Sequence, residues 1–197
     1  MVKFPVSEAE LAKNYDEVMS EVDRLSLERR AEIWRTWPEF VSSAGSWECL
    51  RRIHVVLFGE LFTFAGKLRT QNISKGGFRF ANALFLSNID PIIAEMPQSN
   101  FGEILTKYIE MNIAHPFREG NGRALRLWLD AIFEREINTR IDWRSISRDE
   151  YLSAMQRSPV NTLELDTLLR SSMLNADALG DRDIFLAGLS ASYKYEM

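Results

Sequence analysis

Several features that would point to other protein classes are scarce in this sequence. It has one cysteine, Cys49, so it can form neither an internal disulfide nor a thiolate metal cluster. No apolar run approaches the roughly 18–20 residues that span a bilayer. The first ten residues lack an apolar core followed by a small-residue cleavage site, so we expect no secretion signal. These absences predict a cytoplasmic protein in a reducing compartment, with Cys49 as a small buried hydrophobic residue.

A strong excess of one charge is also missing. The 197 residues include 24 Lys and Arg against 28 Asp and Glu, a net charge of −4. This mildly acidic balance argues against direct nucleic-acid binding and against coating a membrane surface. The hydrophobic fraction of 46% is ordinary for a globular core, and the length suits one domain with a small appendage.

Apolar residues recur at helical spacing along most of the chain, which predicts an all-α protein, a helical bundle. A glycine-rich segment around 74–77, with β-type residues on both sides, predicts one β-hairpin, which we call the flap (residues 72–81). The segment 121–136 has apolar residues on nearly all sides of the expected helix, which is typical of a buried central helix. Capping boxes are predicted at Ser7 and Ser147, and the other expected helices cover 25–41, 47–62, 81–96, 101–114, 163–173 and 183–195.

The residues with chemical potential are concentrated where the central helix is expected to begin. The sequence there is His115-Pro-Phe-Arg-Glu-Gly-Asn-Gly-Arg-Ala-Leu-Arg126. Gly120 and Gly122 permit a close backbone approach, and the exposed amides and dipole of a helix start favour an anion. Arg123 and Arg126, three residues apart, share one face of the first turns. A di- or triphosphate would satisfy these positive groups, because guanidinium groups bind phosphate oxygens well.

Three further side chains of this segment suggest roles in a reaction. Glu119 can hold Mg²⁺, which takes one or two protein carboxylates and otherwise keeps water and phosphate ligands. Asn121 can donate its amide to a phosphate oxygen. His115 has a pKa suited to removing a proton near neutrality. The segment therefore predicts a nucleotide phosphate site with a metal and a base that waits for an incoming hydroxyl.

Structural explanations exist for each residue taken alone. A histidine at a helix end is often only a hydrogen-bonding group, and we assign that role to His54. A Gly-Asn-Gly segment can be a simple turn, and arginines can pair with surface carboxylates for about 0–1 kcal/mol each. A P-loop is excluded, because Gly59 and Gly66 are too far apart and Leu68 replaces the required Ser or Thr.

Residues 115–126 resemble the signature of the Fic family, His-Pro-Phe-x-Asp/Glu-Gly-Asn-Gly-Arg-x-x-Arg, at every defined position. The similarity extends over the flap and over 151–159, about residues 50–197 in all. It implies a Fic fold and AMP transfer from ATP to a Tyr, Thr or Ser hydroxyl of a target protein. It also implies domains over 1–45 (a helical extension), 46–180 (the catalytic core) and 181–197 (an inhibitory helix).

The resemblance gives each motif residue a role. His115 would be the base and Glu119 the Mg²⁺ ligand, while the remaining ATP-binding residues would be Phe117, Gly120, Asn121, Gly122, Arg123 and Arg126. Arg123 would bind the β-phosphate and Arg126 the γ-phosphate. The flap tip, Lys75, Gly76, Gly77 and Phe78, would hold an extended target segment by strand addition. The alternative for the tip is a solvated turn with Phe78 and Phe80 packed inward.

The last residues are similar to the inhibitory motif Ser/Thr-x-x-x-Glu-Gly/Asn of self-inhibited Fic proteins. Ser192 and Glu196 match it, whereas Met197 replaces the Gly or Asn. The resemblance implies that Glu196 pairs with Arg126 and blocks productive binding of the γ-phosphate. Alternatively, Glu196 is a terminal glutamate that faces solvent. Tyr193 and Tyr195, beside it, are candidates for self-modification.

Family members of this size include toxins and regulators, and their candidate targets are the ATP-binding subunits of DNA gyrase and topoisomerase IV. No residue pattern here selects a target or an oligomeric state, and a homo-oligomer is left open. Three alternative functions also stay open: transfer of phosphate or phosphocholine on the same fold, removal of AMP from a modified protein, and non-catalytic nucleotide binding.

Overall fold

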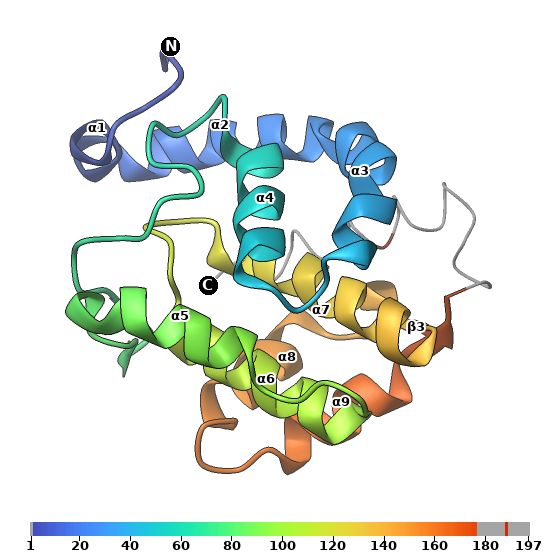
Figure 1. The fold of residues 1–197 in the computed structure, drawn as a ribbon. Helices are drawn as coiled ribbons and strands as arrows, with labels where there is room; N and C mark the ends of the chain where they lie inside the picture. Colours follow the sequence, from blue (N-terminus) through green and yellow to red (C-terminus); the bar gives the residue numbers. More distant parts are fainter. Residues whose placement is uncertain (1, 177–187, 189–197) are drawn as a thin grey trace.

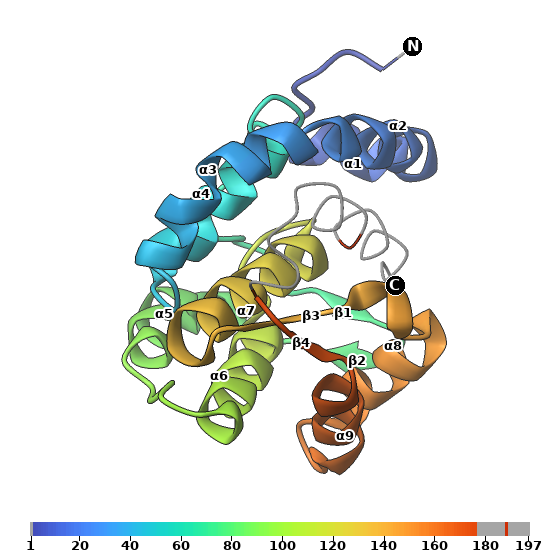
Figure 2. The same ribbon diagram turned by 90° about the vertical axis from the view of Figure 1, so that its right-hand side faces the viewer.

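The computed structural model describes residues 2–176 and residue 188, and it places helix α7 (Asn121–Ile137) at the centre of a mostly helical fold (Figures 1 and 2). Every residue from 123 to 133 is buried, so the predicted central helix is confirmed. It packs against α6 (Phe101–Ala114), α4 (Trp47–Phe58) and α3 (Arg30–Ser42). No helix among residues 2–176 and 188 is both long and apolar enough to cross a bilayer.

The N-terminal segment forms two helices, α1 (Glu8–Lys13) and α2 (Tyr15–Glu28). The capping box predicted at Ser7 is confirmed. The Ser7 hydroxyl accepts the Glu10 N–H at 3.3 Å, and the Glu10 carboxylate accepts the Ser7 N–H at 2.8 Å. The single helix expected over 25–41 is wrong, because α2 ends at Glu28 and α3 begins at Arg30.

The range predicted for α6 agrees at both ends, whereas α4 ends earlier than the predicted 47–62 and the helix predicted over 163–173 ends at Ser171. Apart from residue 188, the helix predicted over 183–195 lies outside the described residues. The segment expected to be helical over 81–96 divides into the 3₁₀ helix η1 (Ala83–Phe85) and α5 (Leu86–Ala94). The capping box predicted at Ser147 is wrong: this residue precedes α8 with extended backbone, but its side chain accepts no bond from the first turn. The other elements are η2 (Trp143–Ser145), α8 (Arg148–Arg157) and α9 (Leu163–Ser171).

Two small antiparallel sheets accompany the helices in residues 2–176, where the sequence predicted one hairpin. The flap consists of β1 (Ser74–Lys75) and β2 (Phe78–Arg79), as expected. The second sheet pairs β3 (Thr139–Ile141) with β4 (Met173–Asn175), two segments far apart in sequence (Figure 2).

Buried Asp130 on α7 anchors the β3 side of this second sheet. Its carboxylate accepts the Ile141 N–H at 3.1 Å and the Trp143 indole N–H at 2.8 Å. Burial raises the pKa of Asp130 to about 7 despite these hydrogen bonds, because ionisation in an apolar interior is costly.

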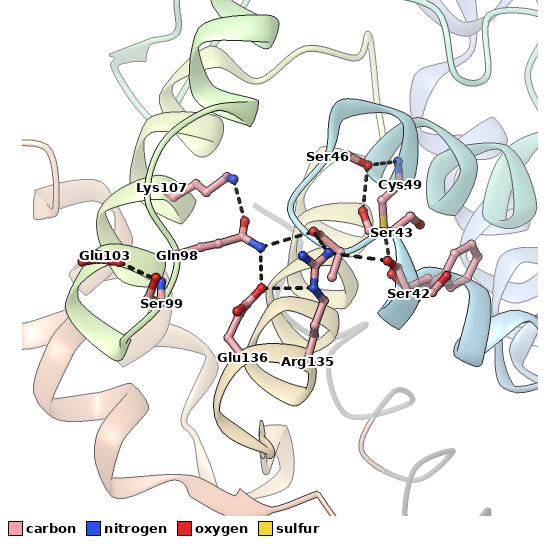
Figure 3. A network of polar contacts seen from close by, with 12 residues as sticks. Ser42, Ser43, Ser46, Cys49, Gln98, Ser99, Glu103, Lys107, Arg135 and Glu136 are labelled. Carbon is pink, nitrogen blue, oxygen red and sulfur yellow. Dashed lines mark hydrogen bonds and ion pairs between the residues drawn. The ribbon is translucent and has the colours of Figure 1, made fainter.

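A polar network fixes the C-terminal half of α7 (Figure 3). Gln98 donates to Glu136 at 2.8 Å and accepts from the Lys107 ammonium at 2.6 Å, and Arg135 donates to the Ala44 carbonyl at 3.0 Å. These bonds join the loops that follow α3 and precede α6 to one end of α7. Cys49, near this network, is fully buried as expected.

Candidate active site

His115 occupies the turn that ends α6, and its backbone is in the left-handed region at φ 47°, ψ 62°. Such a conformation costs a non-glycine residue of order 1–3 kcal/mol unless the surroundings impose it. The His115 N–H donates to the Met111 carbonyl at 3.0 Å, and Pro116 prevents the helix from continuing. The turn therefore directs the imidazole away from the α6 axis.

The contacts of the His115 ring define its neutral tautomer. Nδ1 lies 3.3 Å from the Asn112 carbonyl oxygen, which can only accept, so Nδ1 carries the proton. In the neutral ring Nε2 is then the basic nitrogen. The ring stacks on Phe80 of the flap, with centroids 3.7 Å apart and planes at 16°. This stacking fixes the orientation of the imidazole.

One pocket brings His115 together with the flap and the start of α7. Its wall includes Gly122 and Arg126 from α7, and Lys75 and Phe78 from the flap. The remaining lining residues come from the flap base, α6 and α8: Phe80, Asn112, Tyr151, Leu152, Met155 and Gln156. A base, a guanidinium and helix-start amides thus share one cavity.

The loop from His115 to α7 is closed by its own side chains. Asn121 accepts the Phe117 N–H and donates to the Phe117 carbonyl, both at 2.8 Å. The Phe117 ring is fully buried between Trp47 and His54, so in this conformation it contacts protein and not the pocket. Phe117 and Asn121 therefore shape the loop, and a direct nucleotide contact by either stays a prediction.

Two constraints favour glycine at Gly120. Its φ is 77°, and a Cβ would stand 2.4 Å from a ring carbon of Phe58. It is the N-cap of α7, so the first amides of that helix lie directly after it. The Phe58 ring and the tight turn at Gly120 together bring the positive end of the α7 dipole to the pocket.

His54 supports the loop from beneath, as its predicted structural role requires. Gly66 donates its N–H to Nδ1 at 3.1 Å, so Nε2 carries the proton and donates to the Glu119 carbonyl at 2.8 Å. The ring is fully buried, and burial lowers the pKa of His54 to about 3. His54 is therefore a neutral hydrogen-bonding group that fixes Glu119.

The Glu119 carboxylate is almost fully buried and meets donors from three segments. Tyr15 of α2 donates its hydroxyl at 2.9 Å, the Lys75 ammonium of the flap lies at 3.3 Å, and the Gly120 N–H donates at 3.0 Å. Only 3% of the Glu119 side chain is exposed. Within the described part of the chain, no group of three or more His, Cys, Asp or Glu could hold a metal. A single carboxylate fits the predicted Mg²⁺ site, because this ion takes its other ligands from phosphates and water.

Arg123 and Arg126 contact different neighbours, although their spacing predicted that they share one face of the first turns of α7. Arg126 lies in the pocket, with its guanidinium about 6 Å from the rings of Trp143 and Tyr151. The buried Arg123 extends toward α2, where it donates to Asp23 at 3.0 Å and to Ser26 at 2.9 Å. A separation of three residues rotates the second side chain by about 60° around the helix, so long side chains diverge. Phosphate binding by Arg123 stays a prediction.

The flap tip has the predicted hairpin geometry. Lys75 pairs with Phe78 across a two-residue turn, and Gly76 (φ 55°) and Gly77 (φ 81°) both have positive φ, as in a type I′ turn. The Gly76 carbonyl accepts a bond from Gln156 of α8 at 3.1 Å. Phe78 makes an edge contact with Phe80, so the inward packing left open by the sequence is present while Lys75 and Phe78 also line the pocket.

Several residues of the site could not be identified from the sequence. Tyr15, Asp23 and Ser26 come from α2, which carries no motif, and Arg69 lies in a segment without a recognisable pattern. Tyr151 lies in the 151–159 segment that resembles the family, but the sequence predicts no role in the site for it. The predicted inhibitory residues Ser192 and Glu196, and also Tyr193 and Tyr195, lie outside the described residues.

Comparison with known proteins agrees with this geometry. Residues 46–133 match the model of the Fic/DOC family. Protein adenylyltransferase VbhT of Bartonella schoenbuchensis is 32% identical over 133 residues, which are 61% of this chain but only 27% of that protein. A probable protein adenylyltransferase Fic of Escherichia coli is 24% identical over 137 residues, 64% of this chain and 68% of the relative.

Solved structures show the same fold. The N-terminal Fic domain of a putative cell filamentation protein from Bartonella quintana, with bound ADP, superposes with a TM-score of 0.70 at 18% identity, over 85% of this chain and 89% of that one. BepC of Bartonella tribocorum, with bound AMPPNP, gives 0.67 at 16% identity, over 83% and 89%. The helical Fic fold is thus confirmed, and residues 46–133 of this chain are similar to the Fic/DOC family.

Proposed function

We propose that this protein is an ATP-dependent protein adenylyltransferase that transfers AMP to a Tyr, Thr or Ser hydroxyl of a target protein. The observation that carries the proposal is the shared pocket of His115, Gly122 and Arg126 beneath the flap. Relatives named as adenylyltransferases support it, and so do two structures of the same fold that hold AMPPNP and ADP.

His115 acts as the general base in this reaction. Its Nε2 removes the proton of the target hydroxyl, and the hydroxyl oxygen bonds to the α-phosphorus of ATP. The bond between this phosphorus and the oxygen bridging to the β-phosphate breaks, and pyrophosphate leaves. Phosphoryl-type transfer depends mainly on positioning and charge neutralisation, which a pocket at a helix N-terminus supplies.

The other motif residues bind the triphosphate. The amides near Gly120 and Gly122 meet the phosphate oxygens, and Arg126 binds the γ-phosphate from within the pocket. Glu119 holds Mg²⁺, which neutralises phosphate charge when it is bound. In this arrangement Lys75 leaves Glu119, because a divalent cation and an ammonium compete for the same carboxylate.

The flap positions the target. Its two-residue turn presents strand edges to solvent, and an extended target segment can pair with them. Lys75 and Phe78 line the pocket that contains His115, so a segment paired there would lie close to the base.

Labelled ATP tests the proposal. Incubation of lysate with ATP labelled at the α-phosphate is expected to label a protein band with the wild-type chain and not with His115→Ala, since loss of a general base costs roughly 10²–10⁴-fold in rate. Label that arrives only from γ-labelled ATP would mean phosphate transfer. Release of AMP from a modified protein would mean the reverse reaction. Equal effects of wild type and His115→Ala in cells, without labelling, would mean nucleotide binding alone.

The same assay tests the inhibitory tail. One carboxylate, Glu196, can occupy the Arg126 guanidinium that ATP needs, so Glu196→Gly is expected to increase labelling. Unchanged labelling would remove the autoinhibition from the proposal. The purified ATP-binding subunits of DNA gyrase and topoisomerase IV are the first targets to add, for a cytoplasmic enzyme with a toxin-like or regulatory role. Mass spectrometry of the chain itself would detect AMP on Tyr193 or Tyr195.

A further inference from the structure

Arg69, in the segment between α4 and the flap, forms an unusual set of hydrogen bonds. Only 2% of the residue is exposed. The Arg69 guanidinium donates to four backbone carbonyls, and the Arg69 backbone N–H donates to a fifth. The acceptors are His115 (2.8 Å), Ala114 (3.1 Å), Ala81 (2.6 Å), Gln71 (2.7 Å) and, from the Arg69 N–H, Pro116 (2.9 Å).

These acceptors belong to two parts of the site. Three of them form the turn 114–116 that carries the base, and the other two lie at the two ends of the flap: Gln71 directly precedes it and Ala81 is its last residue. A backbone bond also joins these parts, from the Ala81 N–H to the Ile113 carbonyl at 2.9 Å. Arg69 therefore joins the flap to the catalytic turn.

The chemistry of the acceptors explains why an arginine is required. The left-handed backbone of His115 ends α6 and leaves its last carbonyls without helical partners. The negative end of the α6 dipole favours a cation there. A guanidinium presents five N–H donors in a planar fork and can reach carbonyls on several sides at once, whereas an ammonium is a single point with three donors.

We propose that Arg69 is a positioning residue for AMP transfer: it holds His115 in its left-handed conformation and fixes the flap relative to it. The proposal rests on the proposed function. The flap and His115 must keep a fixed distance and orientation relative to each other, because the flap presents the target hydroxyl and His115 deprotonates it. A displacement of about 1 Å in such an arrangement can cost about 10²-fold in rate.

The first test is Arg69→Lys, which keeps the positive charge and removes the fork, with Arg51→Lys as the control. Arg51 is an arginine of α4 whose partly exposed side chain pairs with Glu48 of the same helix. Arg69→Lys is expected to lower kcat for AMP transfer about 100-fold. Binding of a non-hydrolysable ATP analogue should change less than about 3-fold, since the α7 start and Arg126 are untouched. A proportional loss of analogue binding and rate, or a wild-type kcat, would overturn the proposal.

A second measurement needs no variant, in case Arg69→Lys does not fold. Amide hydrogen exchange of the wild-type protein should show Ala81 and His115 opening together, with protection factors within about 3-fold of each other. If Arg69→Lys does fold, both amides should lose protection in that variant while those of α7 keep it. Exchange at Ala81 that is about 100-fold faster than at His115 would mean that the flap moves independently of the base. The exchange result does not depend on activity, so failure of the wild type to transfer AMP would refute the proposed function and not this coupling.

Discussion

Tyr15 donates a hydrogen bond from its hydroxyl to the Glu119 carboxylate at 2.9 Å, across 104 residues of sequence. This hydrogen bond connects α2 to Glu119, the predicted metal ligand. A second connection from α2 lies further along that helix, where Asp23 and Ser26 bind Arg123. Helix α2 thus contacts Glu119 and Arg123 of the motif, and we expect changes in α2 to alter the site.

The first prediction concerns this contact. Tyr15→Phe removes one hydrogen bond to a buried carboxylate and should lower the free energy of unfolding by about 1.5–3 kcal/mol, the usual range for a bond to a charged group. Urea denaturation measures the loss. Glu119→Gln and the double variant complete a double-mutant cycle, in which a coupling energy of zero would mean that the two side chains do not interact in solution.

A second prediction concerns the ion pair between the Lys75 ammonium and Glu119. Lys75→Met removes a cation that competes with Mg²⁺, so the Mg²⁺ concentration needed for binding of an ATP analogue should fall about 3–10-fold, equivalent to roughly 1 kcal/mol for one partly exposed pair. Calorimetric titrations at several Mg²⁺ concentrations measure this. Lys67→Met is the control, because its exposed ammonium donates to the Thr63 carbonyl and does not line the pocket. An equal shift in both variants would point to a general charge effect.

The third prediction uses two glycines with positive φ. Gly120→Ala places a Cβ 2.4 Å from the Phe58 ring, whereas Gly76→Ala meets no atom within 4 Å. Both variants incur a left-handed backbone cost of about 1–2 kcal/mol, and only Gly120→Ala adds a clash of about 1–3 kcal/mol. Thermal or urea unfolding should therefore rank Gly120→Ala well below Gly76→Ala. Equal losses of unfolding free energy in the two variants would show that the Phe58 ring moves to accommodate the methyl group.

The elements that the sequence predicted correctly depend on local patterns. The range 101–114 agrees with α6 at both ends because Asn100 caps it and His115 ends it. The two glycines of the flap determine its turn. In contrast, the β3–β4 pairing joins segments that are distant in sequence, and neither has a turn signal of its own.

The same distinction applies to the site. The motif 115–126 could be recognised because its residues are adjacent, so loop, helix start and base appear together. Arg69 and Tyr15 could not, because each acts on atoms that only the tertiary fold brings near: backbone carbonyls in one case and a carboxylate in the other. The divergence of Arg123 and Arg126 was missed for a related reason, since helical spacing fixes Cβ directions but not the partners that α2 and η2 offer to long side chains.

The last prediction concerns His54 and the pH dependence of stability. Its pKa is about 3 in the folded protein against the ordinary 6.5, so below pH 6.5 the unfolded chain binds a proton that the folded protein does not. This contribution to stability is complete above pH 6.5 and is lost as the pH falls, by about 1.4 kcal/mol per pH unit. Asp130, with its pKa raised to about 7, acts in the opposite direction, since stability from that group increases as the pH falls from 7 toward 3.8.

The two effects can be separated with His54→Gln. A glutamine can accept the Gly66 N–H and donate to the Glu119 carbonyl as His54 does, but it does not titrate. The difference in unfolding free energy between wild type and His54→Gln should move by about 2 kcal/mol against the wild type between pH 7 and pH 5. Asp130 is present in both proteins and cancels in this difference. A constant difference over that range would mean that His54 takes up a proton in the folded state, and the neutral bridge to Glu119 would then be incorrect.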